Sequence, residues 1–223
     1  MEQAQKIFIP ELRIHRIVSL IIEAIREDLI KSPIEETFLF QVLQDSKADG
    51  YELYEQMKEV FLRKRNDSRY LDVRLFFDAK RAEIPTIHVN LPQETKGEDG
   101  LGSDEGFAPT LFDDNKLEYV RQYNRRFNAN YQVLITSNNS LEVIGLYHIL
   151  RAAIIANLGS LETLGFTNLS LGGGDLQLNP DIIPVTVFVR GINFNFGYEV
   201  TAPAIKREKF YTKIFEKIKP IIS

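Results

Sequence analysis

The chain has no cysteine and no tryptophan, and it holds only three histidines and two methionines in 223 residues. The missing thiols exclude disulfides, thiol nucleophiles and thiolate metal sites. The histidines lack the spacing of paired metal ligands, so we expect each to be either a structural or a surface residue. They are His15, His88 and His148. No Ser-His-Asp order or nucleophile elbow is visible. The sequence therefore predicts no metal, no cofactor and no catalytic residue, and we expect a protein that is not an enzyme.

An excess of charge of one sign is also missing. The formal net charge is −4 and charged residues make up 26% of the chain, which does not point to nucleic acid as a partner of the whole chain. The first residues, Met1 to Lys6, lack the pattern of a signal peptide, which predicts a cytosolic origin. The most apolar stretch, Val143 to Leu161, contains Arg151, so we expect a buried helix and no membrane span.

What the chain does have is 44% hydrophobic residues, enough for a sizeable core. Helical spacing of isoleucine and valine predicts a helix over Glu11 to Lys31, ended by Ser32-Pro33. A second helix is expected over Tyr51 to Arg63. Phe38 to Leu43 is compatible with a strand or a helical turn, and Tyr70 to Ala82 is ambiguous.

Strands are predicted from alternation. Ile84 to Leu91 reads as one strand. Gln93 to Gly106 follows as an acidic, glycine-rich loop with five acids and one lysine, a net charge of −5 + 1 = −4, too polar to pack in a core. Lys116 to Tyr123 and Tyr131 to Thr136 are expected to form an antiparallel hairpin around a turn at Asn124 to Asn130.

The best-marked element is a helix over residues 139–158. Asn139 can cap it, and Glu142 three residues later is expected to complete a capping box. Its apolar residues form two stripes, so both sides need a cover. We expect a sheet on one side and a second helix or a neighbouring subunit on the other.

The end of the chain is expected to contain two strand regions and a helix. Phe166 to Leu171 and Leu176 to Leu178 alternate around Gly172-Gly173-Gly174, and Pro184 to Val200 changes parity at Gly191, which predicts a bulge. Glu208 to Ile222 reads as a short amphipathic helix. Lys206 to Lys219 holds six bases and two acids, a net +4.

Together these elements predict an α+β fold. A mostly antiparallel sheet is expected to pack against a long central helix and an N-terminal helix, with a short C-terminal helix. We expect an N-terminal helical region over 1–83, an α+β core over 84–203 with its acidic loop at 93–106, and a basic helix or tail over 204–223.

Several local patterns allow both a purely structural and a functional interpretation. The glycine run before Asp175 lacks the helix and lysine of a phosphate loop, so a glycine bulge or hairpin corner is expected. The acidic loop does not follow the order of a calcium loop. The basic tail fits docking onto a protein better than lying on a membrane. An alternative function is single-strand nucleic-acid binding by basic and aromatic residues of the expected hairpin at 119–131, namely Arg121, Arg125 and Arg126 with Tyr119, Tyr123 and Phe127.

Two segments resemble tail terminator and neck proteins of tailed bacteriophages, over roughly residues 84–202. The first is Tyr131-Gln132-Val133-Leu134-Ile135-Thr136-Ser137-Asn138-Asn139 leading into Glu142-Val143-Ile144-Gly145-Leu146-Tyr147. The second is Pro184-Val185-Thr186-Val187-Phe188-Val189-Arg190-Gly191.

The resemblance implies a structural virion subunit, made in the host cytoplasm, that forms a homo-oligomeric ring of six or twelve copies at the phage neck or tail end. DNA would pass through without sequence-specific binding, and the neighbours would be portal, neck or tail-tube proteins, with no membrane partner. A ring subunit needs two different complementary patches. Candidate interface or lumen residues are those of the acidic loop and of the basic helix: Glu94, Glu98, Asp99, Asp104, Glu105, Phe210, Ile214, Phe215 and Ile218.

Overall fold

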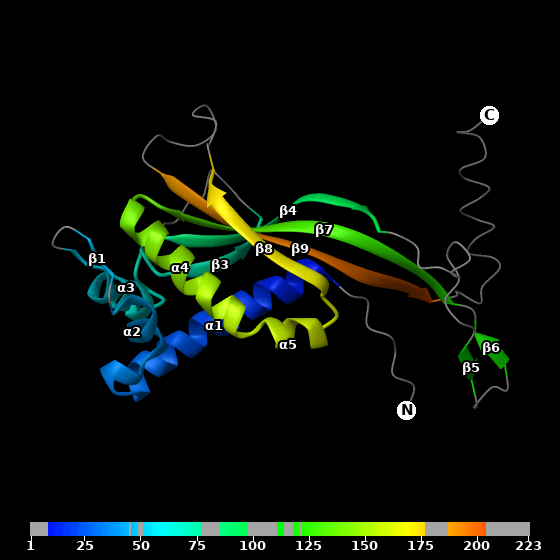
Figure 1. Ribbon diagram of the computed structural model, residues 1–223, viewed down its shortest axis with the longest axis horizontal. Helices are drawn as coiled ribbons and strands as arrows, with labels where there is room; N and C mark the ends of the chain where they lie inside the picture. Colours follow the sequence, from blue (N-terminus) through cyan, green and yellow to red (C-terminus); the bar gives the residue numbers. More distant parts are fainter. Residues whose placement is uncertain are drawn as a thin grey trace. The chain divides into compact units, whose positions relative to one another are not determined.

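The computed structural model describes residues 9–44, 46–48, 51–76, 85–97, 111–113, 118–120, 122–176 and 187–203 (Figure 1). The chain divides into two compact units. The main unit holds Ile9–Thr95 and Asn128–Tyr198, and the smaller unit holds Met1–Phe8, Lys96–Phe127 and Glu199–Ser223. Among the described helices, none is both long and apolar enough to cross a bilayer.

The N-terminal helix is as predicted. Helix α1 spans Pro10–Lys31, with the proline in its first turn, where no backbone donor is lost. Ser32 caps its C-terminal end, with its N–H donating to the carbonyl of Asp28 at 2.9 Å. One apolar stripe at helical spacing is buried: Ile14, Val18, Ile21, Ile22 and Ile25.

A group of short elements follows. These are the 3-10 turn η1 (Ile34–Glu36), helix α2 (Phe38–Leu43), the paired strands β1 (Lys47–Ala48) and β2 (Tyr51–Glu52), and helix α3 (Leu53–Leu62). Phe38–Leu43 is thus helical, and the Thr37 side chain caps it by accepting from the N–H of Phe40. Helices α1, α2 and α3 contact one another and α4.

The main sheet has five strands in the order β3-β4-β7-β9-β8. They are β3 (Asp72–Leu75), β4 (Thr86–Lys96), β7 (Gln122–Ser137), β8 (Thr167–Asp175) and β9 (Phe188–Pro203). Strand β3 pairs parallel with β4, and β8 pairs antiparallel with β9. Strands β4 and β7 run antiparallel. The Thr136 hydroxyl donates to the carbonyl of Thr86 at one end of the pair, and the Thr95 hydroxyl donates to that of Asn128 at the other. The predicted α+β class is confirmed, with a mixed but mostly antiparallel sheet.

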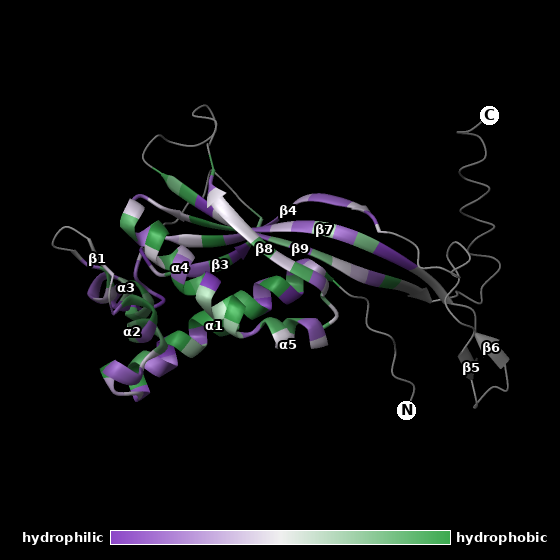
Figure 2. Cartoon of the chain, viewed as in Figure 1, coloured by the Kyte–Doolittle hydropathy of each residue, from purple (hydrophilic) through white to green (hydrophobic). Residues whose placement is uncertain are grey.

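Helix α4 (Ser140–Ala156) and the short α5 (Leu158–Thr163) lead from β7 to β8. The Asn139 side chain caps α4 by accepting from the N–H of Leu141 at 2.9 Å. Tyr147 of α4 lies against Gly173 of β8, so one side of the helix faces the sheet. The other side contacts α1, α2 and α3, so helices supply its second cover. Figure 2 shows α4 as one of the most apolar elements, whereas β8 is pale.

The predicted hairpin at 116–136 is wrong. Strand β7 runs without interruption through Asn124 to Asn130, where a turn was expected, and β6 (Glu118–Val120) pairs instead with β5 (Leu111–Asp113) in the smaller unit. The alternation that starts at Tyr131 extends back to Ala129, which is buried, while Asn128 is exposed. Asparagine favours turns in isolation, but here neighbouring strands on both sides hold it extended.

The acidic loop begins later than predicted. Residues 93–96 belong to β4, and the N–H of Gly97 still donates to the carbonyl of Arg126 at 2.9 Å. These residues are polar because this part of the strand is exposed on both faces, and pairing with β7 keeps them extended all the same.

The predicted bulge at Gly191 is wrong as well. Pairing of β8 with β9 keeps one register from Ser170 to Asp175, across Gly191, and the register shift lies instead between Thr167 and Ser170. The apolar residues switch from odd to even positions because both faces of the sheet are buried near Gly191. Val189 and Ile192 face opposite sides of the sheet, yet both are buried. The predicted helix over Glu208 to Ile222 lies outside the described residues.

Candidate functional site

One face of the main sheet carries a row of uncharged polar side chains. Since side chains alternate along a strand, Asn128 and Asn130 of β7 point away from the face on which Tyr131 is buried by helices. Asn195 of β9 likewise points away from the face on which Phe194 and Phe196 are buried. In the same direction β4 presents Gln93 and Thr95. Three neighbouring strands thus place amide and hydroxyl groups together.

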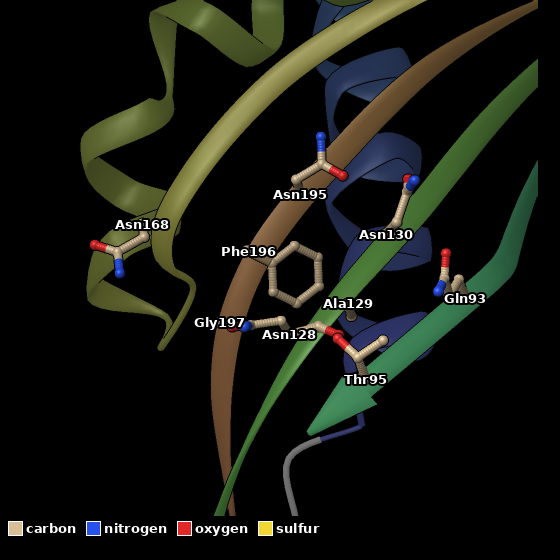
Figure 3. A pocket seen from close by; sticks show the side chains of 9 residues that line it. All are labelled: Gln93, Thr95, Asn128, Ala129, Asn130, Asn168, Asn195, Phe196 and Gly197. Carbon is tan, nitrogen blue, oxygen red and sulfur yellow. The ribbon is translucent and has the colours of Figure 1, made fainter. Parts of the chain in front are cut away.

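These residues line a depression of about 400 Å³, which we call the amide groove (Figure 3). Its lining contains no ionisable side chain. In Figure 3 Asn130 and Gln93 come from adjacent strands, while the Asn168 side chain projects from β8 on the other side. The lining comprises Gln93, Thr95, Asn128, Ala129, Asn130, Asn168, Asn195, Phe196 and Gly197.

Backbone contacts shape the floor of the amide groove. The Thr95 hydroxyl donates to the carbonyl of Asn128 at 3.4 Å, and the Thr167 hydroxyl to that of Gly197 at 2.8 Å. A Cβ at Gly197 would lie only 2.7 Å from Thr167 Oγ1, so a larger residue there would displace the Thr167 hydroxyl. The Asn130 side-chain oxygen is buried and accepts no hydrogen bond from the described residues. The floor is therefore tightly packed and leaves one acceptor unused.

Aromatic packing lies beneath this floor. Phe196 stacks on Tyr131 with ring centroids 5.5 Å apart and meets Phe166 edge-on at 4.7 Å. Burial raises the pKa of Tyr131, and the nearby Glu11 carboxylate raises it further. The phenol, already neutral at physiological pH, therefore stays neutral to a still higher pH.

Glu94 is the one predicted interface residue within the described part of the chain. It lies in β4, and its carboxylate accepts a hydrogen bond from the Tyr198 hydroxyl. Burial, and then this carboxylate, raise the pKa of Tyr198. The other predicted interface residues lie outside the described residues: Glu98, Asp99, Asp104, Glu105, Phe210, Ile214, Phe215 and Ile218.

The best-formed charged cluster surrounds Glu142, at the start of α4. Its carboxylate accepts from the Ser137 hydroxyl at 2.5 Å and from Arg69 at 2.8 Å and 2.9 Å, and Arg63 lies 3.3 Å away. The expected capping box is wrong in its second half, because the N–H of Asn139 donates to Ser137 Oγ. Both carboxylate oxygens are occupied, so this cluster ties elements together and offers no free base.

Only some of the basic residues expected to bind nucleic acid in the alternative function belong to the described residues. Arg125 is exposed on β7, and the Arg126 guanidinium pairs with Glu199 at 2.9 Å, both within the smaller unit. Arg121 and the side chains of Tyr119 and Tyr123 are outside the description.

The histidines have separate environments. His15 bonds to the carbonyl of Val73, and buried His88 to that of Phe76, each at 3.0 Å. Burial lowers the pKa of His88, and burial with nearby Arg190 and Arg151 lowers that of His148. Across the described residues, no group of His, Asp and Glu could hold a metal ion.

No protein-family model matches the chain, and a search of curated proteins finds no match either.

Sequence reasoning missed the amide groove because it placed Asn128 and Asn130 in a turn and Gln93 in a loop. A usable signal was present. Polar and apolar residues alternate without a break from Asn128 to Val133, and again from Ile192 to Tyr198, which indicates two half-exposed strands. Chemically, neutral amides can donate and accept hydrogen bonds, but they supply neither nucleophile nor base.

Proposed function

We propose that the chain is a structural subunit of a homo-oligomeric ring, of the kind found at the neck or tail end of tailed bacteriophages around the DNA channel. The observation that carries the proposal is where the two resembling segments lie. Residues 131–147 supply the second half of the central strand β7 and the first half of helix α4, and the described part of 184–191 begins β9, the strand next to β7. The resemblance therefore falls on the core of the main unit.

The character of the described surface supports a role in assembly. The charged cluster around Glu142 has its carboxylate fully engaged by Ser137 and two arginines. The amide groove is neutral, so it would neither attract nor repel the phosphates of passing DNA. Opposite charges in the segments 93–106 and 206–219, −4 and +4, would suit the two different patches of a head-to-tail contact. The nucleic-acid alternative is less favoured because Arg126 is paired with Glu199.

The test is the mass of the purified full-length chain, measured in solution by light scattering and native mass spectrometry, with electron microscopy of the same sample. We expect a closed assembly of six or twelve copies that binds a portal, neck or tail-tube protein of the same phage. A stable monomer that joins no such protein would overturn the proposal.

A further inference from the structure

The two edges of the main sheet differ in how well they are protected. Strand β3 forms one edge and β8 the other. An unprotected edge presents unpaired N–H and C=O groups and can pair with another strand. An edge that the chain's own groups already occupy is not free to pair with another strand.

Side chains occupy the outward backbone groups of Val73 in the β3 edge. The N–H of Phe76 bonds to Val89 of β4 at 3.1 Å, so by alternation the groups of Val73 point away from β4. The N–H of Val73 donates to Asp72 Oδ1 and its carbonyl bonds to His15 Nε2, each at 3.0 Å. Charged side chains and occupied backbone groups are the usual protection of an edge.

Among the described residues, nothing protects the β8 edge in this way. Leu176 N–H bonds to the carbonyl of Val189 at 3.2 Å, and the register is constant from Ser170 onward. Alternation then directs the N–H and C=O groups of Leu171, Gly173 and Asp175 away from β9. No described strand lies beyond them. The stretch from Ser170 to Gly174 contains no charge and no proline.

An apolar flank of α4 accompanies this open edge. Gly145 packs against Met57 of α3, and Tyr147 on another side of the helix approaches Gly173 of β8. The arc that remains between these contacts carries Ile144, which is half-buried, and Ile155, which is 50% exposed. Its polar members are His148 and Arg151, both exposed.

We propose that β8 pairs antiparallel with β8 of a second copy of this chain, giving a two-fold dimer in which the two α4 flanks lie on the same side of the joined sheet. Pairing of β8 with β8 of a second copy is favoured over pairing of β8 with β3, because the outward groups of Val73 in β3 are already occupied. It also fits by charge. Asp175 is already paired with Arg190 of its own chain at 2.6 Å, and a register centred on Gly173 places each Asp175 opposite Leu171 of the partner copy.

The proposed pairing is compact at its centre. With Gly173 opposite its symmetry mate, three residue pairs would exchange about six backbone hydrogen bonds. The neighbouring glycines remove side-chain bulk from the joined edges. The inference goes beyond the ring proposal and does not rest on it. A two-fold edge contact differs from the head-to-tail contact of a ring, so it would form in a free dimer or between two rings stacked face to face.

The first test compares Leu171→Pro with Leu171→Ala in the full-length chain. Proline removes an N–H that β9 does not use, as at natural protected edges, whereas alanine keeps that N–H and loses the same side chain. We expect wild type and Leu171→Ala to form dimers or larger even-numbered assemblies. Leu171→Pro should weaken the two-fold contact by about 100-fold, measured by sedimentation and native mass spectrometry. Equal behaviour of the two variants, or a wild type that is monomeric or odd-numbered, would overturn the proposal.

A cross-linking test does not depend on the proline variant folding. In the proposed register Gly172 lies opposite Gly174 of the partner copy, in a pair whose Cα atoms are close enough for a disulfide. A Cβ at either position has room, since the nearest atom for Gly172 is 3.9 Å away and Gly174 has none within 4 Å. The chain has no native cysteine. Mixed Gly172→Cys and Gly174→Cys chains should form a heterodisulfide under mild oxidation, whereas Gly159→Cys with Gly174→Cys should not.

Absence of the heterodisulfide, or equal linking of the Gly159→Cys control, would contradict the register and the proposal. The result is separable from the ring. Edge cross-linking in a chain that forms only dimers supports this inference and removes the ring proposal, and a ring whose edges never link does the reverse.

Discussion

Gly173 shows how one residue of β8 is determined by its neighbours on both sides. A Cβ there would meet the Tyr147 hydroxyl and would lie 2.7 Å from the carbonyl oxygen of Gly191. The position therefore needs glycine because α4 covers it, while the adjacent Gly174 faces open space. Two neighbouring glycines in the same run have different reasons to be there.

We expect Gly173→Ala to lower the free energy of unfolding by about 1–3 kcal/mol, because the added methyl group overpacks a contact with backbone. Gly174→Ala is the matched control and should be neutral or slightly stabilising, since alanine loses less conformational entropy on folding. Urea denaturation followed by circular dichroism measures both. Equal destabilisation by the two variants would show that α4 does not press on Gly173.

His88 gives the protein a pH-dependent stability. Burial lowers its pKa below the ordinary 6.5, so the unfolded chain takes up a proton at a higher pH than the folded chain does. Stability is complete above the unfolded pKa. It falls as the pH drops through about 6.5 toward the lowered folded pKa, by at most about 1.4 kcal/mol per pH unit.

The variant His88→Gln should flatten this dependence between pH 7.5 and 5, measured by urea denaturation at each pH. His148→Gln should flatten it less, because that side chain is exposed. An unchanged slope in His88→Gln would assign the acid sensitivity to other groups.

At the scale of elements, Glu142 connects three parts of the chain. It belongs to α4, its Ser137 partner ends β7, and Arg69 precedes β3. Its side chain is only 6% exposed, whereas that of Arg69 is 36% exposed. A buried carboxylate with charged partners costs little when paired but much when one partner is removed.

Glu142→Gln keeps the size of the side chain and removes its charge. We expect a loss of about 2–4 kcal/mol in the free energy of unfolding, at the low end of what breaking a buried pair costs because Arg69 can reach solvent. Glu59→Gln, whose side chain is 75% exposed beside the same Arg63, should cost less than about 0.5 kcal/mol. Chemical denaturation compares them, and similar losses would mean that the Glu142 contacts are not stabilising.

At the scale of the whole molecule, the described sheet is complete without the last residues. Strand β9 ends at Pro203, and the five strands and their helices belong to residues before that point. The segment after it carries the basic residues that we expect to contact another subunit or partner.

Truncation after Pro203 should leave the melting transition of the main unit within a few degrees of the full chain, and should reduce the assembled mass. Differential scanning calorimetry and native mass spectrometry measure the two outcomes. An unchanged assembly would remove the basic tail from the proposed interface. Loss of the melting transition would show instead that the tail is part of the fold.

The α1 helix and the start of α4 followed directly from the sequence. Isoleucines at helical spacing and Asn139 before an apolar run are local signals, because a helix makes its backbone hydrogen bonds within itself. The α+β class followed in the same way. The candidate site did not, since Asn128 and Asn130 favour turns unless neighbouring strands hold them extended.

The sequence by itself determined helices α1, α3 and α4, the alternation of β4 and β9, and the absence of thiol chemistry. Only the tertiary structure decided that β7 is continuous, that β3 is a protected edge and β8 an open one, and that amides from four strands share one groove. The reason is that strands take their hydrogen bonds and their two environments from residues far away in the chain. Which face is buried, and which edge is free, is therefore a property of the assembled sheet.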